Sequence, residues 1–433
     1  MRRKSNRALL LATLLLTGLC STQLRASGYN WRRDKGQSIR FLVNNNTLGH
    51  ALVSKKDEFE KLTGIKVTVD MYQEQQMRQR LLTVLNAKSS EIDVFMTLPS
   101  REGEQFSAAG WLSDLSNRVK ADASPDYDFS DISKKLIDAS TISGRLTSIP
   151  LNIEGPVLYW RADLFKQCNV DLPHKLSDLL EASKKLKACK PQIAPFVSRG
   201  LKPAVAYTLS NFVHNFGGSY MKDGKADLCS QKNRDAYELY STLLRDYGPP
   251  GVATYSFLQI ASLYSAGRAA MAFESSGQIV YISQNPERTK DTSVMLLPPG
   301  PSGSVPTAIS WNLAISPFSA HQDAAWLFVQ WASGPTLQKE LMLQGVPSPR
   351  SSPATSPEYK KWLDEVPLRQ RWNGVLEEMR KNGSSEVGLP IVANAESRDY
   401  VGSPSVNLIL GQRSFDESCK QADAALDQLI QKK

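Results

Sequence analysis

The N-terminal part of the chain alternates strand-like and helix-like segments, and this order constrains the fold more than any other feature. The strands are expected over 39–43, 65–69 and 92–96, and the helices over 51–62 and 75–85. Gly64 stands where a left-handed glycine would end the first helix. Strands joined through a helix run in the same direction, so a βαβαβ order predicts a parallel sheet. We therefore expect an α/β protein.

The length of 433 residues predicts more than one core, because single cores stop growing at about 250–300 residues. Further strands are expected over 146–150, 155–160, 270–273, 294–297 and 308–316, and further helices over 176–187, 208–216, 233–247, 324–331 and 414–430. The stretch 346–357, rich in Pro and Ser, is expected to be a loop. Pro and Gly are concentrated at 298–301, which is typical of a segment that passes between two lobes.

The start of the chain has the pattern of a secretory signal peptide. Basic residues at 2–4 and 7 precede the apolar run 8–19, which is too short to cross a bilayer of about 30 Å as a helix. Residues 1–26 are therefore predicted to be removed after Ala26, which places the mature protein in the periplasm. A lipid anchor on Cys20 ranks second, because Leu19 before it is larger than a lipobox prefers.

The positive charge of the chain does not indicate a nucleic-acid partner. Five of the 52 basic residues lie in residues 1–26, which leaves 47 basic against 43 acidic residues over the rest of the chain. No run of Lys and Arg is interleaved with aromatic residues, so we expect no nucleic acid as partner. The mature protein is expected to be a monomer.

Four cysteines follow Cys20, and an oxidising compartment would allow them to form two disulfides. They are Cys168, Cys189, Cys229 and Cys419. Three connectivities are possible, and the pairing of Cys168 with Cys189 is the local favourite. None of them has the C-x-x-C spacing of a zinc or redox site, so a structural role is expected.

Polar residues follow the predicted strands at the edge where parallel sheets bind ligands. Each one alone is typical of a turn or a helix cap, but together they would line one edge. Trp311 is a candidate for contact with a sugar ring, since it stands between polar residues. The candidate ligand-binding residues from these positions are Asn44, Asn45, Gln73, Thr97, Arg101, Glu274, Trp311 and Asn312.

Catalytic motifs are absent from the sequence. It has four histidines, none in an H-E-x-x-H pattern, and it has no G-x-S-x-G elbow, no phosphate-binding loop and no G-x-G-x-x-G fingerprint. Glu74, Glu154 and Glu274 are carboxylates that a glycosidase could recruit, but nothing in the sequence pairs them. We therefore expect a binding protein without catalytic residues, metal or cofactor.

The order of several short motifs resembles the extracellular solute-binding proteins of carbohydrate ABC importers, of the maltose-binding-protein type. Each motif is weak alone, but the shared order covers nearly the whole mature chain. The motifs lie at 63–67, 93–95, 110–115, 149–150, 158–165, 216–218, 266–271, 297–300, 311–315, 324–328 and 411–414. This resemblance implies a two-lobed type II clamp, with a ligand cleft between lobes that the chain crosses about three times. It divides the chain into lobe one (38–150 plus 298–350) and lobe two (151–297 plus 351–433).

The resemblance also implies roles for particular residues. Glu154 falls on a hinge carboxylate, Tyr207 on a cleft aromatic, Arg101 on a cleft-edge cation and Tyr400 near an aromatic that stacks on sugar. The family's Gly-Pro-Trp after the central strand is replaced here by Ser-Ser-Gly-Gln at 275–278, so a stacking Trp is missing. The implied ligand is therefore a sugar-like solute in the broad sense rather than a maltodextrin.

The same resemblance implies that the closed protein delivers its solute to an ABC permease. A ferric-ion or polyamine carrier of similar architecture is the alternative. An enzyme of the periplasm that acts on glycans ranks third.

Overall fold

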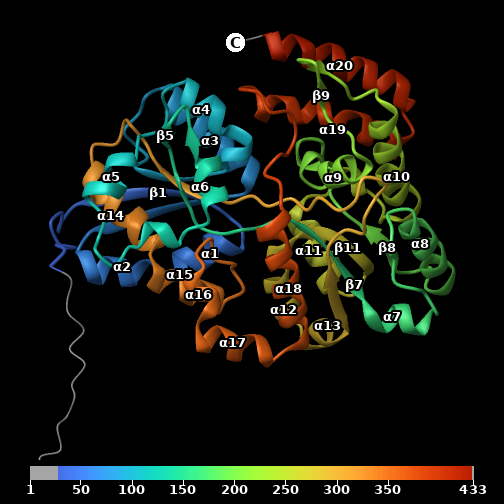
Figure 1. Ribbon diagram of the computed structural model, residues 1–433, viewed down its shortest axis with the longest axis horizontal. Coiled ribbons are helices and arrows are strands. Elements are labelled where there is room, and N and C mark those ends of the chain that lie inside the picture. Colours follow the sequence, from blue (N-terminus) through green and yellow to red (C-terminus); the bar gives the residue numbers. More distant parts are fainter. Residues whose placement is uncertain (1–27, 432–433) are drawn as a thin grey trace, which may run out of the picture.

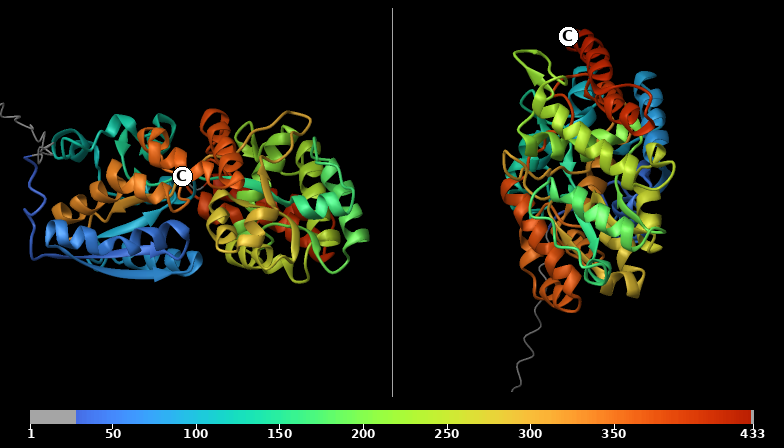
Figure 2. Two further views of the ribbon diagram at one scale, coloured as in Figure 1. Left: turned by 90° about the horizontal axis from the view of Figure 1, so that it is seen from below. Right: turned by 90° about the vertical axis from the view of Figure 1, so that its right-hand side faces the viewer.

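The structure is a computed structural model that describes residues 28–431, and it has two lobes side by side (Figures 1 and 2). The lobe on the left of Figure 1 is built from the N-terminal part of the chain together with α14 (Gln322–Ser333) and α15 (Pro335–Met342). The other lobe contains the middle of the chain and the C-terminal helices. Each lobe has its own sheet, as expected for an α/β clamp.

The sheet of lobe one has five strands in the order β2-β1-β3-β13-β6. They are β1 (Ser38–Asn44), β2 (Lys66–Tyr72), β3 (Val94–Thr97), β6 (Ile149–Pro150) and β13 (Asn312–Ile315). β1 pairs in parallel with β2 and β3, which confirms the predicted βαβαβ unit, whereas β13 runs antiparallel to β3 and β6. Leu42 and Val43 in β1 are fully buried, because helices cover both faces of this sheet.

Short helices surround this sheet. They are α1 (Thr47–Ser54), α2 (Lys56–Thr63), α3 (Glu74–Asn86), α4 (Glu104–Ala108), α5 (Ser116–Ala121), α6 (Lys134–Ser140), α16 (Ser352–Thr355) and the turns η1 (Pro99–Gly103) and η2 (Phe129–Asp131), with the hairpin β4 (Thr141–Ile142) and β5 (Arg145–Leu146). Gly64 ends α2 with φ 75°, as the sequence predicts. The expected loop at 346–357 is wrong in part, since α16 and the first residue of α17 fall within it.

The sheet of lobe two has four strands in the order β12-β7-β11-β8. They are β7 (Pro156–Arg161), β8 (Ala194–Val197), β11 (Ala269–Ser275) and β12 (Thr292–Met295). β11 is parallel to β8 and antiparallel to β7. β6 lies within the expected strand 146–150 and completes the sheet of lobe one, whereas β8 was not expected from the sequence.

Longer helices pack on the sheet of lobe two. They are α7 (Ala162–Gln167), α8 (Asp178–Cys189), α9 (Lys202–Phe216), α10 (Gln231–Tyr247), α11 (Phe257–Ser265), α12 (Ile279–Ser283), α13 (Pro286–Asp291), α17 (Pro357–Asp364), α18 (Pro367–Asn382), α19 (Asn394–Leu410), α20 (Phe415–Gln431) and the turns η3 (Val252–Thr254) and η4 (Ser276–Gln278), with the hairpin β9 (Met221–Lys222) and β10 (Lys225–Ala226). α18 packs against β12, because Trp372 and Leu376 on one helix face are fully buried.

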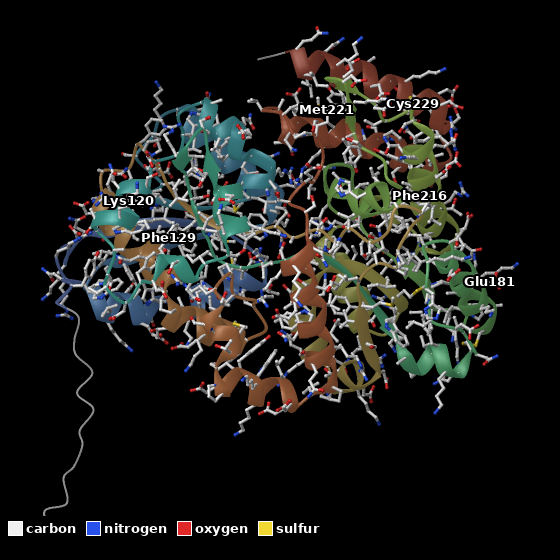
Figure 3. The ribbon with its side chains drawn as sticks, in the orientation of Figure 1. Lys120, Phe129, Glu181, Phe216, Met221 and Cys229 are labelled. Carbon is white, nitrogen blue, oxygen red and sulfur yellow. A yellow bond between two sulfur atoms is a disulfide. The ribbon has the colours of Figure 1, made fainter. Side chains whose placement is uncertain are left out.

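Two hydrophobic clusters form the cores. Phe41, Phe95 and Trp326 lie in one, and Phe196, Phe212 and Trp372 lie in the other. Figure 3 labels Phe129 in lobe one and Phe216 in lobe two, and each packs against the core of its own lobe. The exact division of the chain into 38–150 plus 298–350 and 151–297 plus 351–433 stays a prediction.

The segments that cross between the lobes are hydrogen-bonded to one another. Glu154 and Ile309 exchange two backbone hydrogen bonds of 2.9 and 2.8 Å, and the Ile153 N–H donates to the Pro347 carbonyl at 3.0 Å. A Cβ at Gly155 would lie 1.9 Å from the Thr307 carbonyl oxygen, so only glycine fits this close approach. The crossings at 153–155 and 307–309 therefore lie side by side at the junction, and the chain at Pro347 packs beside them.

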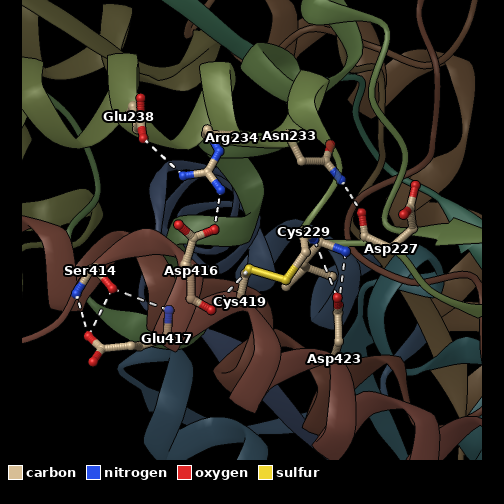
Figure 4. Close-up of a disulfide and its surroundings, with 11 residues drawn as sticks. Asp227, Cys229, Asn233, Arg234, Glu238, Ser414, Asp416, Glu417, Cys419 and Asp423 are labelled. Atoms are coloured by element: carbon tan, nitrogen blue, oxygen red, sulfur yellow. Dashed lines mark hydrogen bonds and ion pairs between the residues drawn. A yellow bond between two sulfur atoms is a disulfide. The ribbon is translucent and has the colours of Figure 1, made fainter.

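Both disulfides lie in lobe two. Cys168 pairs with Cys189, and Cys229 pairs with Cys419 with a Cα–Cα distance of 5.3 Å. Figure 4 shows the second pair, where Asp423 of α20 accepts hydrogen bonds from the backbone of Leu228 and Cys229. The local pairing favoured from the sequence is confirmed, and α20 is fastened to the segment before α10. The predicted signal peptide and Cys20 lie outside the described residues.

We expect the two disulfides to differ in their effect on stability. A crosslink removes chain entropy from the unfolded state, and more for a longer loop. Losing the Cys168–Cys189 disulfide, which spans 21 residues, should lower the free energy of unfolding by about 3 kcal/mol. Losing the Cys229–Cys419 disulfide, which spans 190 residues, should lower it by about 5 kcal/mol. Urea unfolding of Cys168→Ser/Cys189→Ser and Cys229→Ser/Cys419→Ser measures this. Equal losses in the two variants would contradict the expectation.

Candidate functional site

A cavity of about 340 Å³ lies at the junction of the lobes, and residues of both lobes line it. Lobe one contributes the ends of β1 and β2 and the turn η1, lobe two contributes α9 and α11, and α19 adds Arg398. The lining residues are Asn44, Asn45, Asn46, Thr47, Gln73, Glu74, Gln75, Leu98, Arg101, Glu154, Arg199, Leu201, Ala204, Tyr207, Ser256, Phe257, Leu258, Gln259, Ser275, Ile309, Trp311 and Arg398.

Lobe one presents amide groups at the ends of its parallel strands. Asn44 is the last residue of β1, and the Asn46 side chain accepts a hydrogen bond of 2.8 Å from the Gly49 N–H to cap α1. Gln73 stands between β2 and α3. Because the capping requirement fixes the turn after β1, the neighbouring Asn44 and Asn45 are held at the cavity wall.

Lobe two presents a mixture of aromatic and polar groups. The Arg199 guanidinium lies 4.2 Å from the centre of the Tyr207 ring, which fixes one face of that ring. The Tyr207 hydroxyl is buried and has no hydrogen-bond partner within residues 28–431. Ser256 begins α11 with a capping box, which places Phe257 and Gln259 at the wall. The Tyr207 hydroxyl is therefore a buried donor beside the cavity that no group of the described residues uses.

The crossing segments contribute Glu154 and Trp311. The backbone N–H of Trp311 donates to the Asn152 side chain at 2.8 Å, and the Arg78 guanidinium lies 5.3 Å from its ring centre. Trp311 is only 4% exposed, so its ring forms part of the wall rather than a free platform.

Arg199 is held by a fully buried carboxylate. Its Nε and Nη2 donate to both oxygens of Glu274 at 2.8 and 2.5 Å. Burial lowers the pKa of Arg199, but the Glu274 carboxylate outweighs this effect, so the pKa stands above its usual value. Arg199 is therefore a fixed cation in the wall of lobe two.

A second group of charges lies in lobe one. Glu74 accepts from Arg78 at 3.1 Å and from Arg101 at 3.1 Å, and Arg78 also pairs with Glu102. Burial would raise the pKa of Glu74, but the two guanidinium groups lower it to about 2. Burial, together with Arg78, lowers the pKa of Arg101 to about 10.

Glu154 differs from the other carboxylates at the site. Its polar contacts are long, at 3.3 Å from the Asn152 amide and 3.4 Å from the Ser275 hydroxyl. Burial raises the pKa of Glu154 to about 7, and the attraction of Arg199 offsets only part of this effect. Near neutral pH the group is therefore only partly ionised, so its protonated form can donate a hydrogen bond while its oxygens accept.

The structure brings together seven of the residues proposed from the sequence. Asn44, Asn45, Gln73, Arg101, Glu154, Tyr207 and Trp311 all line the cavity. The other four do not line it: Thr97 donates to Glu102, Glu274 holds Arg199 from behind, Asn312 is fully buried between Ser140 and Ser148, and Tyr400 packs against the core of lobe two. A ligand-binding role for any of the eleven stays a prediction.

Sequence reasoning missed two of the charged groups in the wall. Arg199 follows β8. The apolar run 193–197, with Ser198, Arg199 and Gly200 after it, has the pattern of a strand and its following turn, and it was overlooked. Arg398 lies within α19, and no local pattern distinguishes it from a surface arginine of a helix. Its burial depends on how α19 packs on η1 and α9, which a single sequence does not show.

The two lobes, the crossings and the shared cavity define the class of two-lobed solute-binding proteins. The family model for bacterial extracellular solute-binding proteins matches residues 45–339, and the chain belongs to this family. The resemblance seen in the motifs is thereby confirmed.

Individual relatives and solved structures agree with this family. The chain is 24% identical to the erythritol/L-threitol-binding protein of Mycolicibacterium smegmatis, over 71% of this chain and 69% of that protein. It is 25% identical to the mannitol-binding protein of Pseudomonas aeruginosa, over 67% of each. A solute-binding protein of Agrobacterium radiobacter in complex with ribitol has a TM-score of 0.83 at 24% identity, covering 91% of this chain and 99% of that one. Maltose-bound MalE3 of T. maritima has a TM-score of 0.79 at 20% identity, covering 90% and 99%.

The raised pKa of Glu154 predicts a pH dependence of stability. Between its usual value of 4.5 and about 7, the folded protein holds a proton that the unfolded chain releases, so the free energy of unfolding should fall as pH rises through this window. The slope is at most about 1.4 kcal/mol per pH unit. Urea unfolding across the window should show a shallower fall for Glu154→Gln than for the wild type.

The exposed Glu104 provides the matched control, and Glu104→Gln should keep the slope of the wild type. Identical slopes for Glu154→Gln and the wild type would refute the assignment.

Proposed function

We propose that this protein is the solute-binding component of an ABC importer outside the cytoplasm, and that it captures a sugar or polyol in the cavity between its lobes. The observation that carries the proposal is a cavity walled by both lobes, with amides, carboxylates and guanidinium groups beside apolar faces. Hydroxyl groups both donate and accept hydrogen bonds, so a polyhydroxylated solute uses such a mixed wall well.

The size of the cavity supports a small solute. At about 340 Å³ it stands at the lower end of the range for ligand pockets, about 300–1,000 Å³. Relatives named for erythritol, L-threitol and mannitol point to the same class of solute. We therefore favour a polyol or a sugar of one or two rings over a long oligosaccharide.

Closure of the lobes follows from contacts on both walls. A solute that touches Gln73 in lobe one and Tyr207 in lobe two stabilises the closed arrangement, because only its differential affinity for the two arrangements shifts their balance. No covalent step is required. The closed protein would then dock on an ABC permease, and the family places such proteins outside the cytoplasm.

The alternatives are weaker on electrostatic grounds. Arg101, Arg199 and Arg398 line the cavity, so a polyamine would be repelled. Within residues 28–431 no group of three or more His, Cys, Asp and Glu residues could hold a metal ion. A glycosidase needs two carboxylates that flank one bond, whereas Glu74 is already paired with two arginines.

Thermal melting separates these functions. We expect erythritol, ribitol, mannitol or maltose to raise the melting temperature of the purified mature protein, and the solute should be recovered unchanged after incubation. Stabilisation by spermidine or a ferric salt alone would overturn the proposal, and consumption of the solute would indicate an enzyme.

We expect Tyr207→Phe to weaken binding of the best solute by about 3–10-fold, the effect of one neutral hydrogen bond. The variant should fold normally, because the Tyr207 hydroxyl has no protein partner within the described residues. Titration calorimetry measures the affinity. Tyr247→Phe, outside the cavity wall, is the matched control and should bind as the wild type does. Unchanged binding by Tyr207→Phe would remove this hydroxyl from the site.

A further inference from the structure

Three arginines in the cavity wall each keep a guanidinium nitrogen that no protein group uses. Arg101, Arg199 and Arg398 are 6%, 8% and 2% exposed. Within residues 28–431, no acceptor bonds Arg101 Nη2, Arg199 Nη1 or Arg398 Nη1, and these three atoms are not sealed from solvent. Buried charged donors are costly unless they find a partner, so these nitrogens are set to receive one from the cavity.

Arg398 is the least compensated of the three. Its Nε donates to Asn394 Oδ1 at 3.2 Å and its Nη2 to the Val387 carbonyl at 3.3 Å, and no carboxylate lies within 4.0 Å among the described residues. Burial, followed by the repulsion of Arg101 and Arg78, holds the pKa of Arg398 well below its usual value. A negative charge beside Arg398 would offset both the cost of burial and the repulsion by the neighbouring arginines.

Arg101 faces the same region. It lies in η1, which packs against α19 where Arg398 stands. Its one ion pair is with Glu74, which Arg78 shares, and its Nε is buried without a partner within the described residues. Two carboxylates, Glu74 and Glu102, therefore serve Arg78 and Arg101, and Arg398 adds a third cation without an ion pair of its own.

The charges around the cavity do not balance. Arg78, Arg101, Arg199 and Arg398 stand against the buried carboxylates Glu74, Glu102 and Glu274, while Glu154, with a pKa of about 7, is only partly ionised at neutral pH. The exposed Asp399 also attracts Arg101, but from the solvent side. The excess positive charge lies at the end of the cavity formed by Arg101 and Arg398. Arg199 lies 4.2 Å from the centre of the Tyr207 ring, and Glu154 lines the same cavity.

The geometry points to an acidic solute, a sugar or polyol that carries one carboxylate or phosphate group, with its anionic oxygens between Arg101 and Arg398 and its hydroxyls toward Glu154 and Tyr207. This inference rests on the proposed function and narrows its substrate class. Guanidinium groups bind carboxylate and phosphate through paired N–H donors, whereas a neutral polyol would leave the excess charge uncompensated.

Affinity for matched neutral and acidic solutes tests the inference without any variant. Titration calorimetry of the mature protein would compare ribitol with D-ribonate and ribitol 5-phosphate, and mannitol with D-mannonate and mannitol 1-phosphate. We expect an acid to bind about 10–100-fold more tightly than its parent polyol, as charge-assisted hydrogen bonds require. Tighter binding of the carboxylate or of the phosphate identifies the anionic group. Titrations with acetate and with inorganic phosphate alone show whether binding also needs the hydroxyl groups of the solute.

Arg398→Gln tests the residue. It should lose most of the preference for the acid over its parent polyol, since it removes one charge and retains a donor. Arg371→Gln on the exposed side of α18 is the control for total charge and should retain the preference. If Arg398→Gln does not fold, Arg101→Gln is the second variant, and the comparison in the wild type stands by itself.

The outcomes separate the two proposals. Polyols that bind as tightly as their acids, or more tightly, overturn the acidic solute and leave the proposed function intact. A protein that binds no sugar, polyol or acid of these kinds overturns both.

Discussion

The pairing of the crossing strands is the constraint on which the site depends. Glu154 and Ile309 exchange backbone hydrogen bonds where the chain passes between two sheets, and Gly155 permits a contact too close for any side chain. The walls of the cavity are therefore fixed to a common junction, while each lobe keeps its own core. The Glu154 side chain faces the cavity from a backbone that both lobes share.

Buried charge is the second organising principle of the molecule. Arg199 is fixed by Glu274 from behind, so that the guanidinium is rigid without occupying the cavity. Arg78 fixes Glu74 in a similar way by donating a hydrogen bond to it, and its guanidinium also lies against the Trp311 ring. Burying such pairs contributes little to stability once desolvation is counted.

Local patterns in the sequence were sufficient for the parallel unit and for most of the lobe-one wall. Asn44, Asn45 and Gln73 stand at strand ends, where periodicity and topology place them together. Arg398 could not be found this way, because its burial depends on helix packing between distant segments. Asn312 and Thr97 are buried in lobe one and do not line the cavity, because successive residues of a strand point to alternate faces.

The covalent closure between Cys229 and Cys419 spans 190 residues and encloses β13, α14 and α15 of the other lobe. A chain that emerges N-terminus first must hold the Cys229 thiol without its native partner until the further 190 residues to Cys419 have appeared. During that interval a thiol exchange with Cys168 or Cys189 is the competing reaction. The order of oxidation, local bridge first and long bridge last, is thus built into the spacing of the four cysteines.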